Sequence, residues 1–212
     1  IVSIGPKDVA QQMRGLLAMG ADRGILVVSE DAALDSDVVA HVLEAVVKAE
    51  SPDVVVMGKQ AVDGDSNQVG QLLAGYLGWP QATFLASVLF AADGKSARVT
   101  REVDAGVEEK QVPLPAVLTV DLRIIGKKAV RNAALAPEGA EWEESQRYAS
   151  LKGIMAAKKK EIKETSLDAL GVKAQPLVKT TSYTAPPGRK AGQKVASVEE
   201  LVAKLKNEAK VL

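Results

Sequence analysis

The residues best suited to chemistry lie together in one stretch, Gly58–Gly70. This stretch follows the apolar run Val54–Met57 and leads into a helical pattern that ends near Leu77. In open α/β sheets, ligands bind where the chain leaves the carboxyl end of a strand and enters a helix. The first N–H groups of such a helix, and its dipole, favour a phosphate. The stretch therefore predicts a nucleotide site, with an ordinary polar loop as the alternative.

The residue types within this stretch fit a nucleotide in different ways. Gly58 and Gly64 allow a ligand to approach the backbone closely. The backbone N–H groups of residues 66–69 are expected in the first helical turn, where they would face a phosphate. Asp63 and Asp65 are poor neighbours for a phosphate, but their carboxylates can accept hydrogen bonds from a ribose or order the loop.

Other chemistries fit the sequence less well. The D-x-D-x-N pattern that begins at Asp63 opens like a calcium-binding EF-hand loop, but Gln68 stands where glycine is needed and Ala74 where a glutamate belongs. The sequence contains no classical phosphate loop, dinucleotide fingerprint or nucleophile elbow. The only histidine, His41, lies in an apolar helical stretch and is predicted to be structural. These features favour a protein that holds a cofactor over one that transforms a substrate.

The composition excludes several classes of protein. The 212 residues are 47% hydrophobic and 25% charged, which is typical of a soluble globular domain. The absence of cysteine excludes disulfides, thiolate metal sites and cysteine nucleophiles. Because 27 basic residues balance 27 acidic ones, binding to nucleic acid through a global basic field is disfavoured. No apolar run approaches the roughly 20 residues of a membrane span, so we expect no membrane insertion.

The first half of the chain alternates strands and helices. Apolar runs predict buried strands at Ile1–Ile4, Ile25–Val28 and Val54–Met57, and helical spacing predicts helices over Val9–Met19 and Val38–Val47. This alternation predicts an α/β fold with an open, mostly parallel, Rossmann-like sheet of the adenine-nucleotide-binding type. Because the chain opens within a strand, we expect the protein to begin upstream with a further strand and helix.

A β-rich addition follows this α/β region. Short alternating segments separated by Asp93-Gly94 and Ala105-Gly106 turns predict strands over Thr83–Phe90, Ala97–Val103, Val107–Val112 and Ala116–Val120. Residues 126–146 are polar and predict an exposed insertion, while Lys158-Lys159-Lys160 predicts a solvated helix end.

The last part of the chain predicts an extended arm and a helix. Residues 171–192 are rich in proline and glycine, and a capping box, Ser197–Glu200, opens a terminal helix. We therefore expect three regions: an α/β nucleotide-binding domain over 1–125, a region over 126–165 that contains the insertion, and an arm and helix over 166–212 that pack on another subunit.

Several blocks of sequence resemble the electron transfer flavoprotein β-subunit family. They occur in the family's order and cover nearly the whole chain: Leu16–Gly24, Gly58–Gln71, Trp79–Thr83, Arg101–Gly106, Leu114–Val117, Arg147–Leu151 and Ile154–Lys160. The resemblance implies the small subunit of an αβ heterodimer whose single FAD is held mainly by the α subunit. It further implies an electron carrier that accepts electrons from acyl-CoA and related dehydrogenases and passes them to a quinone oxidoreductase. A structural AMP is implied in the small subunit.

The resemblance also implies roles for particular residues. Ile4 matches a nucleotide contact made through its backbone, and Glu102 matches an acidic residue that faces the mobile flavin domain of the α subunit. Leu151 matches the anchor of a loop that docks dehydrogenases, with Ile154 and Met155 beside it. The residues that match the family's AMP-binding stretch are Gly58, Lys59, Gln60, Ala61, Val62, Asp63, Gly64, Asp65, Ser66, Asn67, Gln68 and Val69.

Some features depart from the family pattern and leave alternatives. Lys152-Gly153 replaces the more usual Pro-Asn after the anchor leucine, and residues 126–146 are longer than in mitochondrial-type members, so the dehydrogenase partner stays open. An electron-bifurcating relative, with a second FAD in place of AMP, is one alternative, although Asn67 and Gln71 resemble the AMP-binding type. A stand-alone nucleotide-binding module is another. The implied location is the bacterial cytoplasm, or the mitochondrial matrix for a eukaryotic protein.

Overall fold

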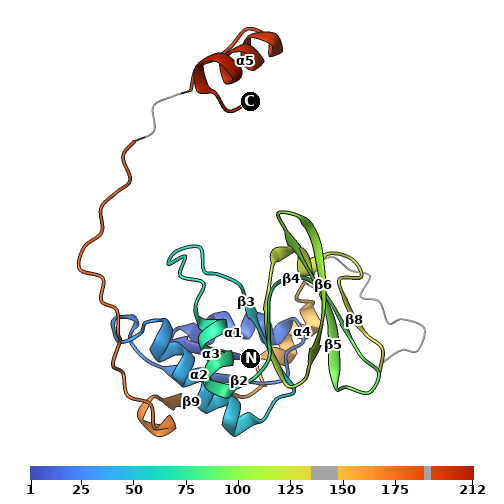
Figure 1. Cartoon of the computed structure of the whole chain (residues 1–212). Helices are drawn as coiled ribbons and strands as arrows, with labels where there is room; N and C mark the ends of the chain where they lie inside the picture. The colour runs from blue at the N-terminus through green and yellow to red at the C-terminus, as the bar shows by residue number, and fades with distance from the viewer. Residues whose placement is uncertain (135–147, 189–191) are drawn as a thin grey trace. The chain divides into compact units, whose positions relative to one another are not determined.

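The computed structural model describes residues 1–134, 148–188 and 192–212 (Figure 1). The chain divides by packing into two units, Ile1–Lys179 and Thr180–Leu212. The predicted fold class is confirmed, since the first unit has mostly parallel strands with helices and a β-rich addition. None of the helices in the described ranges has the length and apolar character needed to cross a membrane.

The helices and strands follow in chain order, with short 3₁₀ turns labelled η1–η3 and a π-helical turn labelled η4. Their bounds are β1 Val2–Gly5, α1 Val9–Ala18, β2 Gly24–Val28, η1 Asp31–Ala33, α2 Ser36–Glu50, β3 Val54–Gly58, α3 Val69–Leu77, β4 Gln81–Phe90, β5 Ser96–Val103, β6 Gly106–Pro113, β7 Ala116–Val120, η2 Leu122–Ile125, β8 Val130–Asn132, α4 Leu151–Ala157, β9 Ile162–Ser166, η3 Asp168–Leu170, α5 Val198–Lys204 and η4 Leu205–Ala209.

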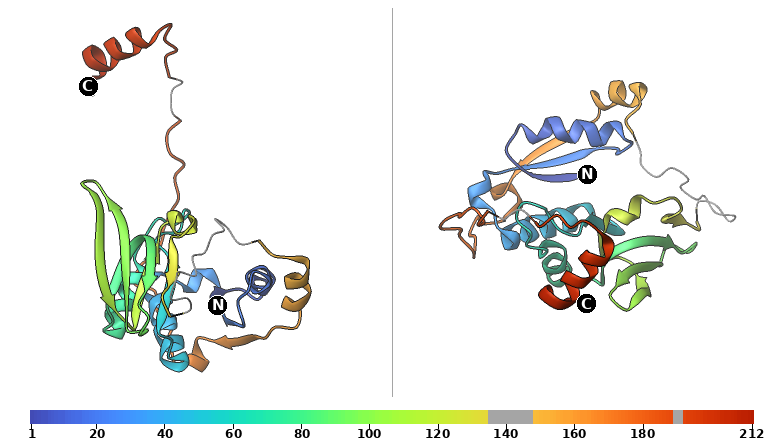
Figure 2. Two further views of the ribbon diagram at one scale, coloured as in Figure 1. Left: turned by 90° about the vertical axis from the view of Figure 1, so that its right-hand side faces the viewer. Right: turned by 90° about the horizontal axis from the view of Figure 1, so that it is seen from above.

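The first sheet contains three parallel strands in the order β1-β2-β9. Its central strand, β2, is almost wholly buried because helices cover both of its faces, with α1 and α2 on opposite sides (Figure 2). On one side Val38, Val42 and Val46 of α2 pack against Ile25 and Val27 of β2. This packing explains why the β2 sequence is apolar without alternation.

The second sheet has the order β3-β7-β4-β5-β6, and β8 pairs with β4. Strands β3, β7 and β4 are parallel, whereas β4, β5 and β6 form an antiparallel meander through two hairpins. The pairing of β4 shifts around Phe84, which has a φ of 60° and lies between the parallel and antiparallel parts. This meander is the predicted β-rich addition.

The strand pairings add details that the sequence pattern did not predict. The three apolar runs of the first half are divided between the two sheets, because β3 pairs with β7 and not with β1 or β2. Strands β8 and β9 were also not predicted: β8 lies within the stretch expected to be an exposed insertion, and β9 covers the edge of β2. Residues 135–147, which include the rest of that expected insertion, and residues 189–191 lie outside the described part of the chain.

Local interactions define the ends of the helices. The N-cap of α2 is Asp35, whose carboxylate accepts a hydrogen bond from the Val38 N–H at 2.9 Å, so the helix begins two residues before the predicted Val38. Ser51 ends α2 in a left-handed conformation. His41 has the predicted structural role: its ring stacks on Tyr76 of α3 at 4.2 Å between centroids.

The second unit contains the terminal helix. Ser197 caps α5 by accepting a hydrogen bond from the Glu200 N–H at 3.2 Å, and the Glu200 carboxylate accepts one from the Ala196 N–H at 2.9 Å. The expected capping interaction therefore forms. Within this unit the apolar side chains of Val198, Leu201 and Val202 are exposed.

Candidate functional site

The predicted nucleotide loop connects the carboxyl end of β3 to the start of α3 (Figure 1). It borders a cavity of about 280 Å³ that is lined by every predicted loop residue except Val62 and Asp63. Gly70, the last residue of the predicted stretch, also lines the cavity, as do Ser36 and Met57, which the sequence did not predict to be there. Ser36 is the first residue of α2, so two helix N-termini border this cavity. Ile4 lies in β1 and does not line it.

Unpaired backbone donors gather just before α3. Within the described residues, the N–H groups of Ser66, Asn67 and Gln68 donate no hydrogen bond. The sequence placed these groups in the first helical turn, but α3 begins at Val69 and Asn67 has a left-handed φ of 49°. The donors therefore belong to the loop before the helix, next to the positive end of the α3 dipole, and this arrangement suits a phosphate.

The two loop aspartates are occupied by hydrogen bonds within the loop. Asp63 accepts from the Gly64 N–H at 2.8 Å, and Asp65 accepts from the Gln60 side-chain amide at 2.5 Å. The Asp65 N–H donates to the Ala61 carbonyl at 2.9 Å, which closes the turn. The carboxylates thus order the loop, one of the roles predicted for them. In the described ranges no group of three or more His, Asp or Glu side chains is placed to hold a metal ion.

The glycines of the loop region differ in their surroundings. A Cβ at Gly58 would have no neighbour within 4 Å, and one at Gly64 would only reach Ser66 Oγ at 3.9 Å, so space above this backbone is open to a ligand. A Cβ at Gly70 would collide with Cγ2 of Thr119 and lie 3.2 Å from Sδ of Met57. Gly70 therefore allows α3 to pack closely on β3 and β7, which fixes the direction of the loop.

A chain of charged side chains begins at the loop. Lys59 Nζ lies 2.5 Å from Asp121 Oδ2, and Arg123 Nη1 lies 3.5 Å from Asp121 Oδ1. Arg123 Nη2 then lies 3.0 Å from Glu102 Oε2. The hydrogen bond from Lys59, together with that from the Arg123 N–H, holds the pKa of Asp121 below its usual range. Glu102, predicted to face the α subunit, is therefore paired within this chain.

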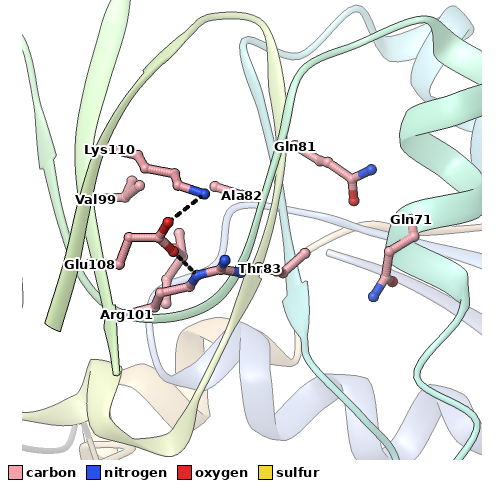
Figure 3. Close-up of a pocket in the computed structure, with 9 residues that line it drawn as sticks. Gln71, Gln81, Ala82, Thr83, Val99, Arg101, Glu108 and Lys110 are labelled. Carbon is pink, nitrogen blue, oxygen red and sulfur yellow. Dashed lines mark hydrogen bonds and ion pairs between the residues drawn. The ribbon is translucent and has the colours of Figure 1, made fainter. Parts of the chain in front are cut away.

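A second cavity, of about 230 Å³, lies between α3 and the β4–β6 meander (Figure 3). Arg101 makes two side-chain contacts at this cavity, since it lies 2.5 Å from Glu108 Oε2 and donates to Thr83 Oγ1 at 3.0 Å. Gln71 connects this cavity to the loop by donating to Asn67 Oδ1 at 3.1 Å. Its own side-chain oxygen is buried and has no hydrogen-bond partner among the described residues.

The predicted docking residues share one exposed face of α4. Leu151, Ile154 and Met155 are 78%, 45% and 58% exposed. The opposite face is held against α1, where a Cβ at Gly153 would collide with the Ala18 carbonyl oxygen. Gly153, one of the departures from the family pattern, thus allows this close contact, which leaves the apolar face free to bind a partner.

Two basic side chains fix the ends of α1 and α4 to each other. Arg14 donates to the Ala157 carbonyl at 2.7 Å and also to that of Lys160. Lys160 Nζ donates to the carbonyls of Leu17 at 3.0 Å and Ala21 at 2.5 Å. The prediction that residues 158–160 form a solvated helix end is therefore wrong for Lys160, which caps α1, whereas Lys158 and Lys159 are exposed.

The fold and the βα loop define an α/β protein of the nucleotide-binding type, and comparison with known proteins identifies its family. Residues 1–170 match the electron transfer flavoprotein domain. The chain is 44% identical over its whole length to the electron transfer flavoprotein subunit beta of Bradyrhizobium diazoefficiens, covering 76% of that protein. It is 43% identical over its whole length to the mitochondrial subunit beta of Arabidopsis thaliana, covering 76% of it.

The human electron transfer flavoprotein subunit beta is 42% identical over 97% of this chain, which covers 73% of the human protein. The chain therefore belongs to the electron transfer flavoprotein family. Within that family it is of the small, β-subunit type, so the resemblance deduced from the sequence blocks is confirmed. Membership implies association with a flavin and with an α subunit.

Proposed function

We propose that this chain binds AMP at the Gly58–Val69 loop and, with an FAD-bearing α subunit, carries electrons from acyl-CoA and related dehydrogenases to a quinone oxidoreductase. The observation that carries the AMP site is that the N–H groups of Ser66, Asn67 and Gln68, beside the cavity, have no acceptor among the described residues. An anion with several acceptor oxygens satisfies such donors, and the α3 dipole adds to its binding.

The roles of the loop residues follow from their positions. The N–H groups of residues 66–68 would bind the phosphate, and Lys59 would add a positive charge at the edge of the cavity. The open backbone at Gly58 leaves room for the ribose or the base. Ile4 is proposed as a further backbone contact from the family resemblance alone, since it does not line the cavity.

The electron-transfer role needs no catalytic side chain in this chain. When FAD is bound, it supplies the redox chemistry, and the protein supplies binding and orientation. The exposed face of α4 is proposed to dock the dehydrogenase: Leu151 gives an apolar contact that becomes buried, while Lys158 and Lys159 attract acidic surfaces. Glu102 is proposed to meet a basic group of the α subunit, and residues 166–212 are proposed to supply the arm and helix that pack on that subunit.

An electron-transfer assay on the complex with the α subunit tests the docking role. Leu151→Ala should lower the rate of flavin reduction by an acyl-CoA dehydrogenase about tenfold or more, the loss expected of an interface anchor, with unchanged flavin content. Leu122→Ala is a matched control, because Leu122 is also a highly exposed leucine, at 82%, and belongs to η2 and not to α4. Equal rates for both variants and wild type would reject the docking role, and loss of flavin from L151A would point to a role in assembly.

The cellular location is proposed from the relatives of this chain. Relatives include a bacterial protein and a plant protein named as mitochondrial. We place this chain in the bacterial cytoplasm, or in the mitochondrial matrix if its source is eukaryotic, and fractionation of source cells with detection of the α subunit tests this assignment.

A further inference from the structure

We infer that Glu102 and Arg123, which lie outside the nucleotide loop, set the affinity of that loop for a phosphate-bearing ligand. Two residues link Glu102 to the loop, because Asp121 and Arg123 each form ion pairs with two partners. Lys59 of the loop lies 2.5 Å from Asp121, which also accepts from Arg123, and Arg123 lies 3.0 Å from Glu102. This inference rests on the proposed function, since it requires that the loop binds the phosphate of AMP.

Asp121, the carboxylate between the two cations, is held in place by backbone hydrogen bonds. Asp121 follows β7, and its N–H donates to the Leu85 carbonyl at 2.9 Å. Its Oδ1 also accepts from the Arg123 backbone N–H at 3.1 Å. Asp121 is 12% exposed, whereas Lys59 is 34% and Arg123 is 56% exposed. The carboxylate is therefore the fixed member, and the two cations compete for it by moving their long side chains.

The direction of the effect follows from counting partners. A bound phosphate attracts Lys59, which then leaves Asp121 with Arg123 as its remaining cation. The guanidinium of Arg123 can neutralise the negative charge of Asp121 fully only if it releases Glu102. Phosphate binding at the loop and release of Glu102 therefore favour each other. Because such coupling is reciprocal, a basic group of the α subunit that takes Glu102 would strengthen nucleotide binding.

Affinity for AMP, measured by calorimetry on the full chain without the α subunit, where Glu102 stays paired with Arg123, tests this inference. Glu102→Gln should strengthen AMP binding about two- to fivefold, because Arg123 then turns to Asp121 and frees Lys59. Arg123→Ala should weaken it by a similar factor, because Lys59 is then the only side-chain cation left for Asp121. Partly exposed ion pairs give effects of this size, and both effects should shrink as salt is raised.

The meander supplies a matched control pair of charges. Arg98 of β5 and Glu109 of β6 form an exposed ion pair at 3.9 Å, and among the described residues neither forms an ion pair or hydrogen bond with Asp121. Arg98→Ala and Glu109→Gln make the same charge changes and should leave AMP affinity unchanged. Adenosine, which lacks the phosphate, should bind all variants equally. In a Lys59→Met background the E102Q and R123A effects should disappear.

The outcomes separate this inference from the proposed function. If the wild-type chain binds AMP but E102Q and R123A behave like R98A and E109Q, the inference is overturned and the nucleotide site stands. If the effects of E102Q and R123A on affinity persist with Lys59→Met or appear equally with adenosine, a general change in the electrostatic field or in the structure explains them. The inference then fails. If wild type binds no AMP, both are overturned.

Discussion

Replacement of Gly70 by alanine tests the close packing that directs the nucleotide loop. A Cβ at this position would collide with Cγ2 of Thr119 and lie 3.2 Å from Sδ of Met57. Thr119 is only 2% exposed, and its hydroxyl accepts a hydrogen bond from the Phe84 N–H at 3.2 Å. The threonine therefore cannot rotate away without losing that bond, and α3 must move instead.

The size of the effect follows from these contacts. Adding a methyl group to a tightly packed site costs about 1–3 kcal/mol of unfolding free energy. Gly75→Ala in the same helix is the matched control, because a Cβ at Gly75 has no neighbour within 4 Å. The control should gain about 0.5–1 kcal/mol, since alanine favours the helix over glycine.

Urea unfolding at fixed protein concentration measures both variants. At equal m-values, the midpoint of G70A should fall below that of wild type, and the midpoint of G75A should rise slightly above it. Because Gly70 lies directly after the loop, G70A should also weaken AMP binding, whereas G75A should not. A G70A midpoint equal to or above that of G75A would refute the packing argument.

The remaining predictions concern three polar side chains. Arg14→Ala leaves the carbonyls of Ala157 and Lys160 without their donor, so amide hydrogen exchange in α4 should accelerate; unchanged exchange would contradict the fixation of α4 on α1. Asp35 accepts hydrogen bonds from the N–H groups of residues 177 and 178 as well as capping α2, so Asp35→Ala should speed proteolysis near those residues, and equal cleavage would reject this role. The lowered pKa of Asp121, due first to Lys59, implies stabilisation that is present above about pH 4 and lost as pH falls through that pKa. Asp121→Asn should therefore be less stable than wild type at neutral pH and converge with it in acid, and a gap that persists in acid would refute this.

The sequence predicted those features that depend on local pattern. The apolar run before Gly58 and the helical spacing after it were enough to place the nucleotide loop between β3 and α3. The docking residues Leu151, Ile154 and Met155 came from two neighbouring family blocks, Arg147–Leu151 and Ile154–Lys160, and the structure places all three on the exposed face of α4.

Features that depend on distant contacts were not predicted. Lys59 and Asp121 are 62 positions apart and meet only because β3 pairs with β7. Lys160 was expected to be solvated because its acceptors are backbone carbonyls more than 130 positions away, which no charge pattern indicates. Strand β9 was not predicted because it contains the polar residues Lys163 and Glu164. It is an edge strand, and its pairing with β2 depends on backbone hydrogen bonds and not on an apolar pattern.

The nucleotide content of the complex tests the central claim most directly. The chain would be purified together with its α subunit and denatured, and the released nucleotides would be quantified by chromatography. The account predicts one FAD and one AMP per heterodimer. Two FADs and no AMP would contradict it and would indicate the electron-bifurcating type, for which binding of NADH is the next experiment.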